Sequence, residues 1–288
     1  MMEHLNQQLF TGERALFKGK DLQISHSVFA DGESPLKESN NIVLENTIFR
    51  WKYPLWYARN IQANNITLVE TARSGIWYTN GITITDSMIQ APKIFRRATD
   101  ITLERVELPN AQETLWNCND ITLEQVNAVG DYFAMNSENI RIEHFTLSGN
   151  YAFDGAKNLE ISHAKLLSKD AFWNCENVVV RDSTIIGEYL GWNSKNITFI
   201  DCIIESNQGM CYMENVKMEN CLLINTDLAF EYSTVDVQAN SHIDSVKNPI
   251  SGTITAAGIG ELILDDPEIA AENTKYQLAE DREYAIRL

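Results

Sequence analysis

The sequence has no C-x-x-C pair, and its five cysteines in 288 residues are an odd number. Zinc and iron–sulfur centres use cysteines at such short spacing, and a disulfide framework needs an even set. Neither class of protein is therefore indicated. We predict that the chain binds no metal and no cofactor, and that its cysteines are free buried thiols.

An excess of positive charge is also missing. The chain has 23 Lys and Arg against 40 Asp and Glu, which gives a formal net charge of −17 at pH 7. Such a protein repels nucleic-acid phosphates and anionic membrane surfaces. We therefore expect neither nucleic acid nor membrane as a partner, and among saccharides we expect a neutral one rather than a polyanion.

Long apolar runs are absent as well. No stretch reaches the length of a membrane span. The first twenty residues, MMEHLNQQLFTGERALFKGK, lack the basic segment followed by an apolar stretch that marks a signal peptide. A cytoplasmic location fits these two absences best.

What the sequence does have is one short phrase that occurs eleven times, as in NNIVLENTIF from Asn40, NGITITDSMI from Asn80 and KNITFIDCII from Lys195. The second residue of each phrase serves as an anchor. The anchors recur with a nearly constant period, apart from one long and one short step near the start. A fixed period of about 20 residues indicates a solenoid with one coil per repeat. The anchors are Asp21, Asn41, Asn65, Gly81, Asp100, Asp120, Asn139, Asn158, Asn177, Asn196 and Asn215.

Each phrase alternates apolar and polar residues, as in Ile82 and Ile84 around Thr83. This period of two predicts a short strand with one buried face. The anchors are all Asp, Asn or Gly, which best tolerate a left-handed backbone, so we expect a tight bend in each coil and amide hydrogen bonds between stacked asparagines. A second apolar pair, such as Ile48 and Phe49, adds another strand. A coil this short that holds three strands and three turns leaves no room for a helix.

The predicted fold is therefore all-β. We expect a single-stranded right-handed parallel β-helix of about 12 coils, each of roughly 19–20 residues. The right hand is favoured because parallel crossovers almost always take it. The repeat predicts one structural domain with an N-terminal cap at 1–19, the β-helix at 20–256 and a C-terminal cap or tail at 257–288. The ends of a solenoid expose unpaired strands and need covering, and a helix or a hairpin could cover the second end.

The chain resembles a family of uncharacterised bacterial proteins of about this length. The stretch FTGERALFKGKDLQIS, followed by FADGESPLKESNNI, carries the resemblance, which extends over essentially the whole chain. It implies a right-handed β-helix allied in fold to the pectate lyases. It implies no activity and no catalytic motif, so catalytic residues are not assigned and enzymatic activity is left open.

Stacked coils turn each repeat position into a column of side chains. Four of the six tryptophans fall in one column, four residues before the anchor. If this column faces outward, it forms an aromatic stripe with a step of ~4.8 Å, comparable with one sugar unit. If it faces inward, the tryptophans belong to the core. Under the first reading the ligand-binding residues are Trp77, Arg96, Trp116, Asp154, Trp173 and Trp192.

Two further columns are polar. The column three residues before the anchor is rich in asparagine, which predicts a structural ladder or else polar contacts for the stripe. The column five residues after the anchor includes His144, His163, Asp182 and Asp201. Such a row could bind a metal or supply an acid–base pair. Turn positions are commonly polar because they are solvated, and a straight row offers poorly converging metal ligands.

Catalysis by the stripe is not supported by its spacing. Arg96 and Asp154 lie three coils apart in the repeat. Three steps of the strand spacing amount to roughly 14 Å, so the two side chains cannot act on one bond. Two functions remain. The chain is predicted to be carbohydrate-binding or carbohydrate-active through the aromatic stripe. The alternative is a non-enzymatic scaffold that uses the same face to associate with itself or with a partner.

Overall fold

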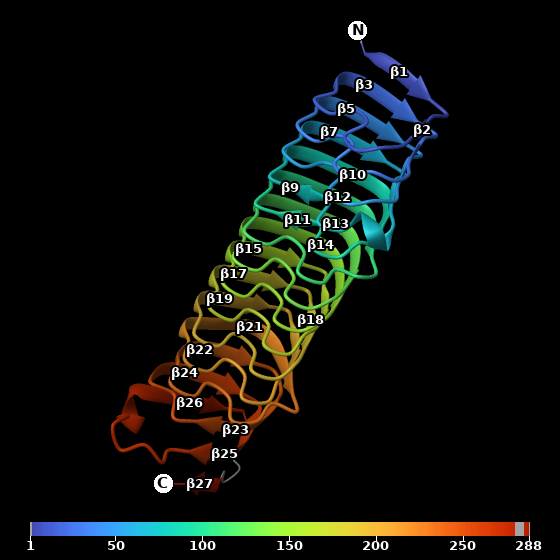
Figure 1. Cartoon of the computed structure of the whole chain (residues 1–288). Helices are drawn as coiled ribbons and strands as arrows, with labels where there is room; N and C mark the ends of the chain where they lie inside the picture. The colour runs from blue at the N-terminus through green and yellow to red at the C-terminus, as the bar shows by residue number, and fades with distance from the viewer. Residues whose placement is uncertain (1, 280–284, 288) are drawn as a thin grey trace. The chain divides into compact units, whose positions relative to one another are not determined.

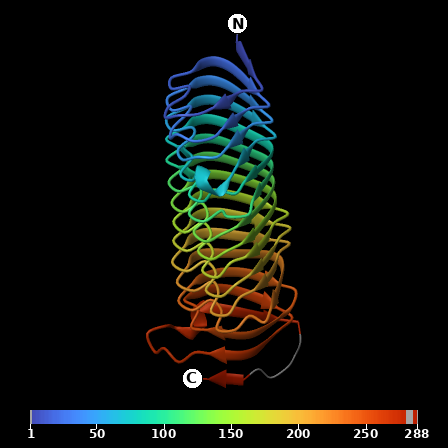
Figure 2. The ribbon, with the colours of Figure 1, turned by 45° about the vertical axis from the view of Figure 1, so that its right-hand side comes forward.

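The computed structural model describes residues 2–279 and 285–287. The contacts within the chain divide it into unit 1, Met1–Ser148, and unit 2, Gly149–Leu288. Within each unit the strands follow one another coil by coil, as the colour gradient in Figure 1 and the turned view in Figure 2 show.

Unit 1 contains fourteen strands and one short 3-10 helix among its described residues. They are β1 (Glu3–Asn6), β2 (Leu9–Phe10), β3 (Lys20–Ser25), β4 (Val28–Phe29), β5 (Asn40–Glu45), β6 (Ile48–Phe49), β7 (Arg59–Asn64), β8 (Thr67–Leu68), η1 (Glu70–Ala72), β9 (Ile76–Trp77), β10 (Asn80–Ile89), β11 (Phe95–Arg96), β12 (Thr99–Leu108), β13 (Asn119–Val129) and β14 (Glu138–Ser148).

Unit 2 contains thirteen strands and one short 3-10 helix, counted over the part of it that the structure describes. They are β15 (Lys157–Ser162), β16 (Lys165–Leu167), β17 (Glu176–Arg181), β18 (Thr184–Ile186), β19 (Lys195–Ile200), β20 (Ile203–Glu205), β21 (Glu214–Ile224), β22 (Thr234–Ala239), β23 (His242–Lys247), β24 (Ser251–Ala256), β25 (Gly258–Ile263), η2 (Ala271–Asn273), β26 (Thr274–Leu278) and β27 (Ala285–Arg287).

Strands of successive coils pair in parallel and in register. Ile82 in β10 lies beside Ile101 in β12, and Val178 in β17 lies beside Ile197 in β19. The anchors take the left-handed backbone, with φ of 57° at Asp120 and 55° at Asn196. The prediction of an all-β parallel solenoid is confirmed. The described residues form eight turns in unit 1 and seven in unit 2, more than the expected total.

One anchor was placed in the wrong register. The sequence pattern selects Asn65, but the strand that pairs with both neighbouring coils is β7, in which Ile61 lies beside Ile42 and Ile82. The true anchor is Asn60, with φ of 53°, and Asn65 occupies the turn five residues later. The strand β7 carries Ala63 where the neighbouring coils carry Leu44 and Ile84, so its alternation is weaker than that of the segment after it.

The third part of each coil is made mostly of turns rather than of a third long strand. Hydrogen bonds between neighbouring coils still run through it, as from Tyr57 N to Trp77 O at 2.9 Å and from Leu55 N to Gly75 O at 2.9 Å. Left-handed residues bend it, for example Tyr53 with φ of 61° and Tyr57 with φ of 57°. This segment of turns, which we call the turn face, carries the predicted aromatic column.

The parallel ladder extends into both segments expected to be caps. The strand β1 pairs in parallel with β3, so residues 3–6 start a further coil. At the other end, β26 pairs in parallel with β24 and β25 pairs in parallel with β23. Residues 257–279 therefore continue the solenoid and form neither an α-helix nor a hairpin. Residues 280–284 and 288 of the predicted tail lie outside the described residues.

The core lies inside the coils and contains its own stacks. Phe29 packs between Phe10 and Phe49 with ring centroids 4.7 Å apart on each side in unit 1. In unit 2, Phe153 stacks on Phe172 at 5.3 Å. Such stacks bury large apolar area and fix the distance between coils. No helix in the described part of the chain is long and apolar enough to cross a membrane.

Candidate functional site

The aromatic column of unit 1 is a stack on the turn face. Trp56 and Trp77 lie parallel, with centroids 5.4 Å apart and planes 7° apart. Each side chain is half-buried. Trp56 was missed by the sequence pattern because the anchor of its coil was read five residues too late. With the register corrected, five of the six tryptophans occupy this position.

Arg96 continues the stack where a ring is missing. Its guanidinium carbon lies 4.8 Å from the centroid of Trp77 and 4.6 Å from that of Trp116, so the cation is held between two indoles. Glu113 accepts a hydrogen bond from Arg96 Nη2 at 3.4 Å and pairs with Lys93 at 3.0 Å. Cation–π contacts and an ion pair thus explain how a charged residue is accommodated in a half-buried position.

Each indole nitrogen of the column donates a hydrogen bond to a backbone oxygen in the next coil. Trp77 Nε1 donates to Lys93 O at 2.8 Å, and Trp116 Nε1 donates to Tyr132 O at 2.6 Å. In each case the acceptor lies 16 residues further along, in the next coil. Because buried polar groups are costly unless hydrogen-bonded, this repeated bond fixes the ring over the next turn. Trp56 makes a bond of the same kind within unit 1.

The column of unit 2 has the same design over a shorter length. Trp173 stacks on Trp192 with centroids 5.7 Å apart, and their Nε1 atoms donate to Tyr189 O at 2.7 Å and Gln208 O at 2.9 Å. Asp154, which belongs to the same column, accepts a hydrogen bond from Asn174 Nδ2 at 2.7 Å. Further along, the column continues with Cys211 and Phe230, which are buried.

These contacts determine which surfaces of the aromatic rings are accessible to a ligand. Within each unit the faces of neighbouring rings lie against one another, and their nitrogens are bonded to backbone oxygens. Sugars pack on the faces of aromatic rings, whereas here Trp77 has a neighbour on each face and Trp173 and Trp192 stack on one another. The binding role of Trp77, Arg96, Trp116, Asp154, Trp173 and Trp192 stays a prediction, and their observed contacts are those of a coil-to-coil stack.

The neighbouring columns of asparagines form ladders. In the anchor column, Asn177 Nδ2 donates to Asn158 Oδ1 at 3.0 Å, and Asn196 and Asn215 continue the chain at 3.1 and 2.9 Å. In the column three residues earlier, Asn193 Nδ2 donates to the oxygen of Asn174 at 2.8 Å. The predicted amide ladders therefore exist, and their role is structural.

The column five residues after the anchor is also bonded from coil to coil. Asn65 Nδ2 donates to Asn46 Oδ1 at 2.6 Å, and Arg105 Nε donates to Asp86 Oδ1 at 2.6 Å. The hydrogen bond from Arg105 lowers the pKa of the Asp86 carboxyl below its ordinary value. His144 belongs to unit 1, where Glu143 lies 3.9 Å from its Nε2, and His163 belongs to unit 2. The prediction that the chain binds no metal stays a prediction, and metal binding by this row stays the alternative to it.

The five cysteines are free and buried. Burial raises the pKa of the Cys118 and Cys211 thiols to about 12. Cys202 and Cys221 lie on adjacent coils, where Leu222 N donates to Cys202 O at 2.9 Å. The hydrogen bond from the Cys202 thiol lowers the pKa of Cys221 and raises that of Cys202 itself. None of the five is thus exposed as a reactive thiol.

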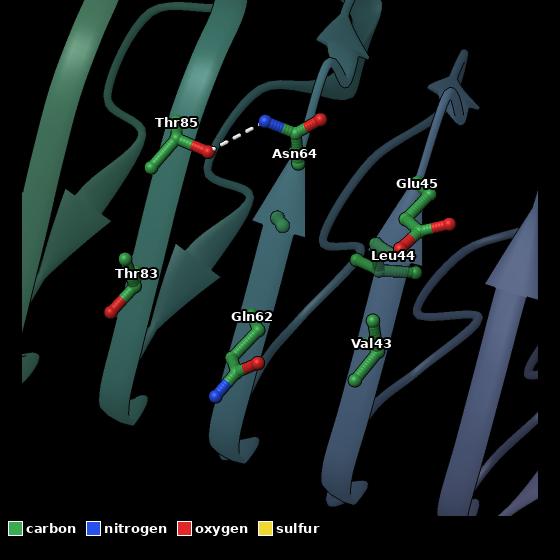
Figure 3. Close-up of a pocket in the computed structure, with 8 residues that line it drawn as sticks. Val43, Leu44, Glu45, Gln62, Asn64, Thr83 and Thr85 are labelled. Carbon is green, nitrogen blue, oxygen red and sulfur yellow. Dashed lines mark hydrogen bonds between the residues drawn. The ribbon is translucent and has the colours of Figure 1, made fainter.

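A hollow that the sequence pattern did not indicate lies on the outer strand face of unit 1. It has a volume of about 280 Å³ and extends over β5, β7 and β10. Figure 3 shows its side chains pointing outward from three adjacent strands, with Asn64 Nδ2 donating to Thr85 Oγ1 at 2.8 Å. The side chains that point into it are Val43, Glu45, Gln62, Asn64, Thr83 and Thr85.

A second hollow of about 260 Å³ adjoins the first and shares Val43, Gln62 and Thr83 with it. It extends toward the anchors, where Gly81 lies between Asn60 and Asp100. Gly81 has φ of 74°, and a Cβ added there would lie 3.3 Å from Asn60 Oδ1. Gly81 therefore interrupts the row of anchor side chains, and the side chains of Asn60 and Asp100 lie close on either side of it. We call the two hollows together the strand-face groove.

The strand-face groove was missed for a physical reason. Alternation in the sequence assigns Thr83 to the outer face of its strand, as observed, whereas Gln62 was missed because its strand was read five residues too late. It cannot show where that face is hollowed, because this depends on the conformations of the side chains on adjacent strands. The glycine among Asn and Asp anchors was the one visible sign.

The chain belongs to a protein family of unknown function, DUF3737, whose model matches residues 3–277. This confirms the resemblance read from the sequence near the N-terminus. No curated protein matches the sequence significantly.

Two solved structures show a distant similarity to the chain. The A-module of the mannuronan C-5 epimerase AlgE4 from Azotobacter vinelandii has 11% sequence identity and a TM-score of 0.28, over 99% of this chain and 88% of that chain. QnrB1, a plasmid-mediated fluoroquinolone resistance protein, has 11% identity and a TM-score of 0.18, over 72% of this chain and 84% of that chain. Likeness at this level transfers no site and no activity.

Proposed function

We propose that the protein binds a neutral carbohydrate chain, and that the strand-face groove of unit 1 is the binding site. The observation that carries the proposal is the lining of two adjoining hollows by amides and hydroxyls on neighbouring coils. Ligand sites are concave and carry a few placed polar groups. Sugar hydroxyls both donate and accept hydrogen bonds, as do the amide of Gln62 and the hydroxyl of Thr83.

The repeat of the fold supports a linear ligand. Equivalent side chains on adjacent strands lie ~4.8 Å apart, a step comparable with one sugar ring. Gln62 and Thr83 are one such pair, and Asn64 and Thr85 are another in the parallel register of β7 and β10. A chain of sugars that lies across the strands would meet the same kind of polar group at each step.

Charge supports a neutral ligand over an acidic one. Glu45 lines the first hollow and Asp100 the second, and among the described residues no Lys or Arg lines either. A polyanion would meet like charge there, with the whole chain at −17. A neutral oligosaccharide avoids this cost and needs only hydrogen bonds.

The test is a glycan array printed with neutral, cationic and anionic oligosaccharides, followed by calorimetry with the strongest neutral hit. In the double variant Gln62→Ala/Thr83→Val, we expect affinity to fall at least tenfold, since two polar contacts are lost (~1 kcal/mol or more each). Thr122→Val is the matched control. Thr122 occupies the position of Thr83 two coils further on, is exposed, and lies outside the groove.

A Trp116→Leu variant separates the two candidate surfaces. If the strand-face groove binds the sugar, the folded variant keeps full affinity. Loss of affinity in Trp116→Leu, with no change in Gln62→Ala/Thr83→Val, would return the site to the aromatic column. The absence of any saturable hit on the array would refute carbohydrate binding altogether.

A further inference from the structure

Five large apolar side chains are exposed together on the second-strand face of unit 2. They belong to β16, β18, β20 and β21, which pair in this order, so Leu167 lies beside Ile186 and Ile203 lies beside Leu222. Exposed apolar residues are ordinary when scattered, but a contiguous group marks an interaction site. We call this group the apolar strip; its exposed fractions are Leu167 48%, Ile186 39%, Ile203 40%, Leu222 37% and Ile224 44%.

The size of the apolar strip fits one segment of a partner. It extends over three steps between coils, roughly 14 Å at ~4.8 Å per step, and two columns of side chains, about 7 Å apart. A stable interface between folded proteins buries about 800 Å² on each partner. A second copy of this chain would find too little apolar surface here, whereas a single helix or strand could cover it.

The spacing favours a helix. One turn of an α-helix rises about 5.4 Å, close to the ~4.8 Å between coils. A helix that lies across the four strands would therefore place one apolar side chain over each coil, at positions i, i+3 or i+4, and i+7. In a partner strand, the side chains that face the strip would recur about every 6.7 Å. They would be out of step with the ~4.8 Å spacing of the coils after two coils.

The charges around the apolar strip indicate which residues should flank the apolar face of a partner helix. Asp182 and Asp201 occupy the exposed turns that lead into β18 and β20. Glu205 lies between Ile186 and Ile224 within the strip. Two cations lie near these carboxylates: Lys165 in β16, and the exposed Arg181 directly before Asp182. Unit 2 as a whole has 22 Asp and Glu against 10 Lys and Arg. Lysine or arginine beside the apolar residues of a partner would complement these carboxylates.

We propose that the apolar strip is the docking site for a basic amphipathic helix of a partner protein. This goes beyond the proposed saccharide site, which lies in unit 1 and uses none of these residues. Apolar side chains of the helix cover the strip, while its cations face Asp182, Asp201 and Glu205. The interaction is therefore expected to weaken as salt is added.

The test uses fluorescence polarisation of a labelled peptide of about 14 residues, composed of leucine and lysine in an i, i+3, i+4, i+7 pattern. We expect saturable binding to the full chain, and at least tenfold weaker binding to Ile186→Ser/Leu222→Ser. Met88→Ser is the matched control, since Met88 is 36% exposed on the equivalent face of unit 1. A peptide with glutamate in place of lysine should bind at least tenfold more weakly than the lysine peptide.

A second variant tests the charges without touching the apolar strip. Asp182→Asn/Asp201→Asn should bind the lysine peptide more weakly at low salt and show a smaller salt dependence. Equal binding by the wild type and by Ile186→Ser/Leu222→Ser would overturn the proposal, as would equal binding of the two peptides. Self-association in sedimentation that Ile186→Ser/Leu222→Ser abolishes would assign the strip to a second copy instead.

Discussion

Units 1 and 2 use the same coil but tie successive coils together through different columns. In unit 1 the anchor column is interrupted by Gly81, while the turn face carries an unbroken stack from Trp56 to Trp116 through Arg96. In unit 2 the tryptophan stack is short, while the anchors from Asn158 to Asn215 form a continuous amide ladder. Both units also contain the other kind of contact, such as the bond from Asn139 to Asp120 in unit 1 and the stack of Trp173 on Trp192 in unit 2. The longest continuous outer column is therefore the turn-face stack in unit 1 and the amide ladder in unit 2.

The two units also differ in charge and in their exposed surface. Unit 1 has 13 Lys and Arg against 18 Asp and Glu, and unit 2 has 10 against 22. Most basic residues of unit 1 lie on or near its turns, where Lys37, Lys52 and Arg96 contact aromatic rings. The apolar strip of unit 2 has no equivalent of the same length among the described residues of unit 1. The two units therefore share the same coil but differ in the residues at its outward-facing positions.

The largest expected effect is at the centre of the unit 1 stack. Trp77→Ala removes a half-buried ring, its stack on Trp56, its contact with Arg96 and its bond to Lys93 O. We expect the free energy of unfolding to fall by about 2–4 kcal/mol. Chemical denaturation measures the loss, and hydrogen exchange should locate the lost protection in unit 1. A fall below about 0.5 kcal/mol, the range of ordinary surface substitutions, would show that the stack contributes little.

A smaller effect is expected from the unit 2 ladder. Asn196→Ala breaks two amide hydrogen bonds and places alanine at a left-handed φ of 55°. We expect a loss of about 1–3 kcal/mol in the free energy of unfolding. Asn196→Gly is the matched variant, because glycine accepts this backbone and loses only the hydrogen bonds. If both variants are equally destabilised, the ladder bonds account for the effect. If Asn196→Gly is as stable as the wild type, the ladder is dispensable and the comparison fails.

The smallest effect concerns pH. Arg105 lowers the pKa of Asp86 in the folded state. This carboxylate therefore stabilises folding above its unfolded pKa, and the contribution is lost as pH falls through the folded pKa. We expect the stability of the wild type to fall more steeply than that of Asp86→Asn as the pH decreases below about 4. Melting temperatures measured from neutral to acidic pH test this. Parallel curves for the two proteins would contradict it.

The fold could be predicted because its signal repeats. Alternation at residues such as Ile82 and Ile84, and the Asn or Asp at each anchor, recur often enough to fix strand, bend and parallel stacking. The register of β7 could not be predicted, because Ala63 weakens its alternation. Ile66 and Leu68 have the spacing that other coils show in their first strand, so the strand was predicted there instead. The first coil was missed because Met2 occupies the anchor position. The coil of β26 was missed because Asn273, which occupies its anchor position, lies outside the 19-residue period.

The site was harder to predict than the fold. The pattern placed tryptophans in one column correctly, but whether a ring face meets solvent or another ring depends on side-chain rotation. Trp77 and Trp116 enclose Arg96, a contact that only the three-dimensional stack reveals. The strand-face groove includes Gln62, whose strand was read in the wrong register, and Gly81, which the sequence shows as the one glycine among the anchors.

The most direct test of the structural role of the turn-face stack is a double-mutant cycle between Arg96→Leu and Trp116→Leu, read by chemical denaturation. If the guanidinium is held between the rings as the structure shows, the two substitutions should be coupled by about 1 kcal/mol. Effects that simply add, to within about 0.3 kcal/mol, would show that the column does not act as a stack. They would contradict the assignment of these tryptophans to coil-to-coil stability.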